Sequence, residues 1–128
     1  VVQTQVLPWG LLSAMDMAEM ADLVLGSDLT YNSGTWRVLA ETMETVVTPN
    51  GYILYLSCGH EGFNVNAEVE GFLAVAREVG LVPVNELYGV NLSQVLPSLL
   101  SPAEVKQLQS SGGARVVVLQ RKPIVKKS

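Results

Sequence analysis

The alternation of apolar and polar positions predicts three strands in the first half of the chain. Residues 1–7 alternate valine with glutamine, as a half-buried strand does, and Pro8 ends this segment because proline donates no ladder hydrogen bond. Residues 22–31 contain an apolar run that ends in polar side chains. Residues 51–58 form a nearly continuous apolar segment, which is typical of a central strand covered on both faces.

Apolar residues at steps of three and four predict two amphipathic helices. The first contains Trp36, Leu39, Met43 and Val46, and the second contains Val69, Phe72, Leu73, Ala76 and Val79. Ser33 or Thr35 could cap the first helix, and Pro49-Asn50-Gly51 ends it. Asn66 is the expected cap of the second helix, and Gly80 stands where a left-handed residue closes it.

The second half of the chain adds two strands and a short helix. Residues 81–88 predict a strand, and Pro83 within it favours an edge position. Ser101 opens a capping box with proline at the first helical position, so a helix is expected through about Gln109. Residues 115–121 contain three consecutive valines and predict the last strand.

This alternation of strands and helices predicts an α/β fold with a mostly parallel sheet and helical crossovers. The last strand follows a short insertion rather than a full crossover helix, which favours an antiparallel pairing for it. Ser13 could cap a short helix over residues 14–20, unless that stretch is an irregular loop.

Composition narrows the functional classes. The chain has 128 residues, 48% of them apolar, which fits one globular domain. Cys58 is the single cysteine, so no intrachain disulfide can form, and a cytoplasmic or nuclear location is expected. The net charge of −4 gives no basic stripe for a nucleic acid, and no apolar run is long enough for a membrane span. Residues 122–128 form a polar tail.

The candidate chemistry lies where two predicted strands end. Asp28 and Tyr31 follow the apolar run, and ligands of open α/β sheets bind outside the carboxyl ends of strands. A structural alternative is that Asp28 caps the next helix while Tyr31 packs against it. Cys58 and His60 are expected on the same side, but a lone loop histidine is usually solvated and a buried thiol is usually inert. No cluster has the spacing of metal ligands, so no metal is expected.

Three strings of the sequence carry a family resemblance: VLPWG at residues 6–10, DLVLGSDLTY at residues 22–31 and TPNGYILYLSC at residues 48–58. Together they resemble the later half of the seven-strand (class I) S-adenosylmethionine-dependent methyltransferases, closest to the protein-lysine methyltransferases with a D-x-x-Y motif. The resemblance implies a partial Rossmann-like sheet, S-adenosylmethionine as cofactor and a protein lysine as methyl acceptor. It also implies that Trp9 borders the cofactor's adenine and that Asp28 and Tyr31 border the site where lysine meets the methyl donor, with Asp28 also on the cofactor side.

The family's cofactor loop needs closely spaced glycines, and an acidic residue after the second strand holds the ribose. No two glycines of this chain stand in a G-x-G arrangement, and residues 1–10 already resemble the third strand. We therefore expect residues 1–128 to be a single partial domain that lacks the N-terminal cofactor-loop half and is not competent alone. The absent strands would leave the edge of the strand at residues 22–27 open to a second copy, through homo-oligomer formation or strand exchange.

Two other functions stay open on the sequence alone. A non-enzymatic interaction domain would use the same scaffold, with the open edge or the segment containing Leu96, Leu99 and Leu100 as its contact surface. A methyltransferase acting on a small molecule would share the retained motifs, since these do not determine the acceptor.

Overall fold

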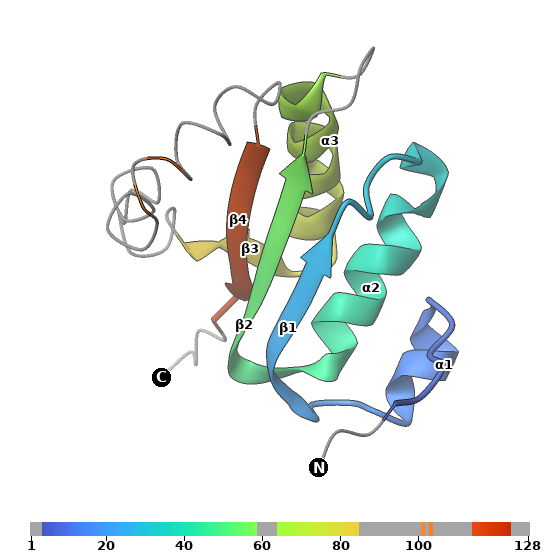
Figure 1. Cartoon of the computed structure of the whole chain (residues 1–128). Helices are drawn as coiled ribbons and strands as arrows, with labels where there is room; N and C mark the ends of the chain where they lie inside the picture. Colours follow the sequence, from blue (N-terminus) through green and yellow to red (C-terminus); the bar gives the residue numbers. More distant parts are fainter. Residues whose placement is uncertain (1–3, 59–63, 85–100, 102, 104–113, 124–128) are drawn as a thin grey trace, which may run out of the picture.

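The computed structural model describes residues 4–58, 64–84, 101, 103 and 114–123. Within them, one sheet of four strands has the order β1-β2-β4-β3 (Figure 1). The strands are β1 (Ala21–Ser27), β2 (Val47–Cys58), β3 (Leu81–Pro83) and β4 (Ala114–Arg121). β1 pairs parallel with β2, whereas β4 pairs antiparallel with both β2 and β3. The α/β class and the antiparallel last strand are confirmed. The sheet is less parallel than predicted, because β4 lies between β2 and β3 and leaves β1 and β2 as the parallel neighbours among the described strands.

The helices are α1 (Leu11–Met15), the 3-10 turn η1 (Ser33–Thr35), α2 (Trp36–Val46) and α3 (Val65–Glu78). α2 and α3 pack against the same face of the sheet, and α1 packs against α2 (Figure 1). The core between helices and sheet contains Leu39, Met43, Ile53, Tyr55, Phe72 and Leu119. This single layer of helices leaves the opposite face of the sheet uncovered by the described helices.

The apolar stripe predicted for α2 is confirmed, because Leu39, Met43 and Val46 are buried. The predicted cap is wrong in detail. Thr35 occupies the N-cap position without a side-chain capping bond, and the Oδ1 of Asn32 instead accepts from the Gly34 N–H at 3.0 Å. The 3-10 turn explains the difference, because it brings the chain into the helix one turn early.

Pro49-Asn50-Gly51 does not separate α2 from β2, contrary to the prediction. α2 ends at Val46, β2 begins at the next residue, and the register passes from Ala21↔Val47 to Leu23↔Tyr52. The extra residues on β2 form a bulge, where proline is tolerated because ladder pairing is interrupted. A Cβ at Gly51 would lie 2.8 Å from the backbone oxygen of Asp22, so the close approach of the two strands requires glycine here.

Three predictions concern α3 and the strand that follows it, and two of them are confirmed. The cap lies two residues earlier than expected, because Asn64 rather than Asn66 accepts from the Ala67 N–H at 3.1 Å. Gly80 closes the helix with φ of 98°, as predicted. The edge position predicted from Pro83 is also confirmed, because β3 pairs with β4 alone among the described strands.

The N-terminal prediction needs correction. Residues 4–7 form no ladder, and Val6 is 88% exposed. An alternating pattern produces a strand only where a neighbouring strand supplies hydrogen-bond partners. α1 begins at Leu11 with Gly10 at the N-cap, so Ser13 lies inside the helix and does not cap it. Most of the predicted helix at 101–109 lies outside the described residues.

Arg121 joins the C-terminal end of α2 to the last strand. Its guanidinium donates to the carbonyl oxygens of Glu44 at 2.8 Å and Thr45 at 3.1 Å, and it pairs with Glu19 at 2.9 Å. These carbonyls belong to the last turn of α2, where a helix leaves its acceptors unpaired. Arg121 therefore replaces the intrahelical donors that are missing there.

We expect Arg121→Met to lower the free energy of unfolding by about 1–3 kcal/mol, because it removes charge-assisted hydrogen bonds from partly buried carbonyls. Arg115→Met is the matched control on the same strand, since Arg115 pairs with the exposed Glu70 and should cost roughly 0–1 kcal/mol. Urea unfolding of both variants measures the difference. Equal losses would show that Arg121 does not cap α2.

No helix in the described ranges is long and apolar enough to cross a membrane.

Candidate functional site: the turn after β1

The turn at the carboxyl end of β1 carries both of the polar residues singled out from the sequence. The Asp28 N–H donates to the Leu56 carbonyl at 2.9 Å, which extends the contact with β2 one residue beyond the strand. Asp28 has φ of 52°, in the left-handed region that aspartate tolerates better than most residues. Tyr31 follows with its side chain 67% exposed. Asp28 and Tyr31 thus lie directly beyond the carboxyl end of β1, at the place in the fold that the sequence predicts for them.

Thr30 anchors this turn through buried hydrogen bonds. It is fully buried, between the part-exposed Asp28 and the exposed Tyr31. Its N–H donates to the Tyr55 hydroxyl oxygen at 3.1 Å, and the neighbouring Leu29 N–H donates to the same oxygen at 2.9 Å. The Thr30 hydroxyl lies 2.7 Å from the Tyr55 hydroxyl and donates to Oε1 of Glu68 at 2.6 Å.

The donors of this cluster can be assigned by counting protons. The Thr30 hydroxyl has one proton, and the Glu68 carboxylate accepts it. The Tyr55 hydroxyl must then donate to Thr30, while its oxygen accepts from two backbone N–H groups. Every hydrogen-bonding position of the Tyr55 hydroxyl is therefore used. A buried network that is fully satisfied holds the turn in one conformation.

A tryptophan fixes the remaining polar group of Thr30. The Trp36 Nε1–H donates to the Thr30 carbonyl oxygen at 2.8 Å. The other side of the indole packs on α3, where a Cβ at Gly71 would lie 2.5 Å from Trp36 Cη2. Since real Cβ atoms do not approach a ring so closely, only glycine at this position of α3 leaves room for the indole.

Gly71→Ala is expected to displace the Trp36 ring and to cost about 1–3 kcal/mol of stability, as overpacking in a core usually does. The fluorescence of Trp36, measured in a Trp9→Phe background, should shift towards that of an exposed indole. Ala74→Gly serves as a control for helix propensity, because Ala74 lies on the exposed side of the same helix. An unchanged Trp36 spectrum would contradict the packing argument.

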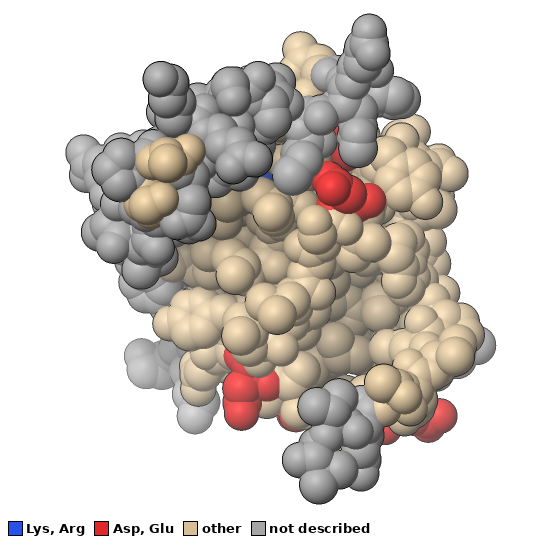
Figure 2. Space-filling view, in the orientation of Figure 1, with Lys and Arg blue, Asp and Glu red and all other residues tan. Residues whose placement is uncertain are grey.

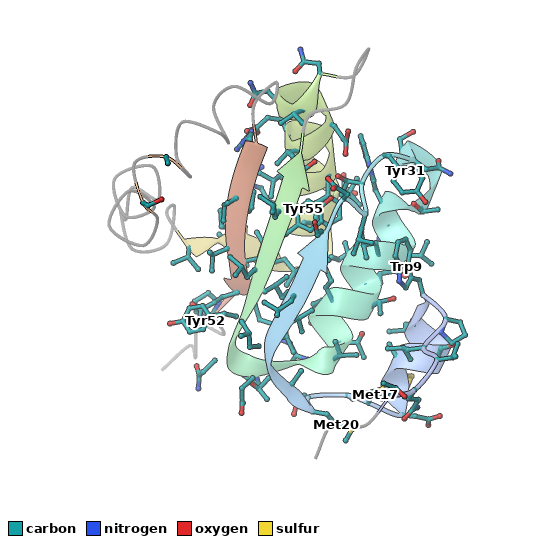
Figure 3. All side chains as sticks on the ribbon, viewed as in Figure 1. Trp9, Met17, Met20, Tyr31, Tyr52 and Tyr55 are labelled. Carbon is teal, nitrogen blue, oxygen red and sulfur yellow. The ribbon has the colours of Figure 1, made fainter. Side chains whose placement is uncertain are left out.

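Trp9 lies on a different segment from the other two candidates. Its indole is 39% exposed, and the next residue, Gly10, donates its N–H to the Thr42 hydroxyl of α2 at 2.8 Å. Thr42 is six residues beyond Trp36, roughly 9 Å along the helix axis. Figure 3 labels Trp9 and Tyr31 on the α2 side of the sheet. The structure therefore joins Asp28 and Tyr31 in one turn, whereas Trp9 belongs to a separate segment that is bonded to α2 through Gly10.

The structural alternative for Asp28 and Tyr31 does not fit the observed helix start. Asn32 is the residue whose side chain accepts from the first turn, at the Gly34 N–H. Tyr31 is 67% exposed, so most of its surface does not pack against that helix. His60 and the side chain of Cys58 lie outside the described residues. Within the described ranges, no group of three metal-ligating side chains comes together.

Sequence reasoning missed Thr30, Tyr55 and Glu68. Thr30 stands inside the D-x-x-Y string as one of its variable positions, and Tyr55 and Glu68 look like ordinary strand and helix residues. One signal was present: Tyr55 is a phenol within the apolar segment 51–58, and a buried phenol needs a hydrogen-bond partner. That signal indicates a buried polar contact but not its partners.

Comparison with known protein families assigns the chain to one of them. A family model described as lysine methyltransferase matches residues 1–67, which contain Trp9, Asp28 and Tyr31. A search of curated proteins gave no match. Because the family match covers more than half of the 128 residues, this chain belongs to the lysine methyltransferase family.

Proposed function

We propose that this chain carries the acceptor side of an S-adenosylmethionine-dependent protein-lysine methyltransferase. The observation that supports this most strongly is the turn after β1, in which buried hydrogen bonds to Thr30 hold a carboxylate and an exposed phenol at the carboxyl end of a strand. The four-strand α/β sheet with its helical layer is compatible with a methyltransferase fold.

Asp28 and Tyr31 are the proposed catalytic residues. The carboxylate of Asp28 attracts the ammonium group of the incoming lysine and orients it, and the phenol of Tyr31 lines its path. Asp28 and Tyr31 would hold the deprotonated lysine nitrogen facing the methyl group that bound S-adenosylmethionine would supply by displacement from its sulfur. Such a displacement depends mainly on alignment of the two reactants and on exclusion of water. A turn held in one conformation by buried hydrogen bonds can provide this alignment.

The residues present fit one part of the cofactor. When bound, S-adenosylmethionine supplies the methyl group on a positively charged sulfur. The partly exposed indole of Trp9 offers an apolar face against which an adenine can stack, and the Asp28 carboxylate can approach the cofactor from the turn. The glycine-rich loop that would hold the methionine part has no counterpart in this sequence. We propose that residues outside this chain supply it.

Calorimetric titration with S-adenosylhomocysteine tests whether this chain holds only part of the cofactor site. For the 128-residue chain alone, we expect a dissociation constant weaker than roughly 1 mM, since only part of the ligand finds contacts. For the complete gene product, we expect micromolar binding that Trp9→Ala weakens about tenfold. Micromolar binding to the 128-residue chain alone would show that it holds the cofactor without a glycine-rich loop.

A further inference from the structure

Glu68 is the last acceptor in the chain of hydrogen bonds that holds the turn at residues 28–31. Its Oε1 accepts from the Thr30 hydroxyl at 2.6 Å, and the oxygen of that hydroxyl accepts from Tyr55. An ionised carboxylate has no proton to donate, so the Glu68 side chain only accepts. Glu68 therefore sets the direction of these bonds, which run from the Tyr55 hydroxyl through Thr30 to the carboxylate.

The same carboxylate oxygen also contacts the end of the neighbouring strand. Ser57 of β2 is fully buried, and its hydroxyl donates to Oε1 of Glu68 over a longer distance of 3.5 Å. Because Thr30 follows β1, Glu68 joins the carboxyl ends of two parallel strands to α3. Figure 1 shows the first turn of α3 beside the end of β2, and Figure 2 shows acidic atoms at the molecular surface near this end of the sheet.

The first turn of α3 holds the backbone of Glu68 in place. The Glu68 N–H donates to the Asn64 carbonyl oxygen at 3.0 Å, and the Asn64 side chain caps the helix at the Ala67 N–H. The next residue, Val69, is fully buried in the core. A side chain that starts from a rigid element holds its partner in a defined position. Glu68 thus has the support that is needed to position Thr30.

Thr30 passes any displacement on to both proposed catalytic residues, since it lies two residues after Asp28 and directly before Tyr31. Without the Glu68 carboxylate, the buried Thr30 hydroxyl loses the acceptor of its proton. A network that is only partly satisfied no longer selects one conformation of the turn. A shift of about 1 Å in a reacting group is enough to slow a reaction strongly.

We propose that Glu68 is a positioning residue for lysine methylation, and that it acts through Thr30 on Asp28 and Tyr31. This inference rests on the proposed function. The role needs a hydrogen-bond acceptor at residue 68 but no negative charge. Glutamine retains an acceptor oxygen in its side chain, whereas leucine has none. Glu68→Gln should therefore preserve the role and Glu68→Leu should abolish it.

Steady-state methylation by the complete gene product tests this role. Glu68→Leu should raise KM for the lysine substrate about tenfold, as loss of one charge-assisted hydrogen bond would, and leave KM for S-adenosylmethionine within about twofold. Glu68→Gln should stay within about threefold of the wild type for both substrates. A variant that is merely less folded has a lower apparent kcat, but its two KM values do not diverge.

A double-mutant cycle tests whether Glu68 acts through Thr30. In a Thr30→Val background there is no hydroxyl for Glu68 to hold, so Glu68→Leu should change KM for the lysine substrate by less than about twofold. Glu70→Gln is the matched control on the same helix, because Glu70 is 59% exposed and pairs with Arg115. It should leave both KM values within about twofold of the wild type.

Amide hydrogen exchange at Leu29 and Thr30 needs no substrate, and it should be faster in Glu68→Leu than in Glu68→Gln. Three results would overturn the positioning role: equal impairment of these two variants, which would indicate a role for the charge; an equal effect of Glu68→Leu with and without the Thr30 hydroxyl; or unaltered exchange in Glu68→Leu. A wild type that methylates no lysine would instead overturn the proposed function, whatever the exchange rates show.

Discussion

Tyr55→Phe is expected to lower the free energy of unfolding by about 2–4 kcal/mol, although it removes a single oxygen atom. The Leu29 and Thr30 N–H groups lose their acceptor, and the Thr30 hydroxyl loses its donor. Thr30 is fully buried, so water cannot replace these bonds without rearrangement of the turn. The cost is therefore that of several buried groups without partners, and it exceeds the value of one hydrogen bond.

Tyr52→Phe provides a control on the same strand. Tyr52 is 46% exposed on the opposite face of the sheet, and loss of its hydroxyl should change stability by less than about 0.5 kcal/mol. Urea unfolding measures both variants, and amide hydrogen exchange at Leu29 and Thr30 locates the change. Equal stability of the two variants, with unaltered exchange at the turn, would mean that the Tyr55 hydroxyl does not hold the turn.

Asp28→Asn in the complete gene product is expected to reduce kcat/KM for lysine methylation on the order of 100-fold, a loss typical of a misplaced reactant. Asparagine also tolerates the left-handed conformation that Asp28 adopts, so the substitution removes the charge while keeping the backbone. The proposed role of the carboxylate is to attract and orient the lysine, so KM for the acceptor should rise as well.

Two comparisons separate this effect from a general loss of acidic charge. Asp16→Asn changes an exposed carboxylate after α1 and should leave kcat/KM within about twofold. Tyr31→Phe keeps the ring that lines the proposed lysine path and should cost less than Asp28→Asn. Full activity of Asp28→Asn with normal acceptor KM would remove the carboxylate from the mechanism.

Elements with a strong local pattern could be predicted from the sequence. The stripe from Leu39 to Val46 and the apolar segment at residues 51–58 each contain their own periodicity, so α2 and the paired part of β2 appear where expected. Element ends were less predictable. The local sequence Pro49-Asn50-Gly51 is typical of a turn. Only the contact with Asp22 on the neighbouring strand shows that these residues form a bulge within β2.

The candidate site likewise has residues that the sequence predicts and residues that it does not. Asp28 and Tyr31 could be predicted because they follow an apolar strand in sequence, and strand ends are where α/β sheets bind ligands. Their supports could not, since Thr30 meets Tyr55 and Glu68 across separations of 25 and 38 residues. No local pattern encodes such contacts. Residues 4–7 show the reverse case, where a local strand pattern has no ladder partner within the described residues.

We propose that the turn at residues 28–31 delivers a protein lysine to a methyl donor. The most direct test is to incubate the complete gene product with isotopically labelled S-adenosylmethionine and protein acceptors, and to locate the label by mass spectrometry. We expect label on the Nζ atom of a lysine, at a rate that Asp28→Asn lowers on the order of 100-fold in a folded protein. Label on a small molecule alone, or lysine methylation that Asp28→Asn leaves unchanged, would contradict this proposal.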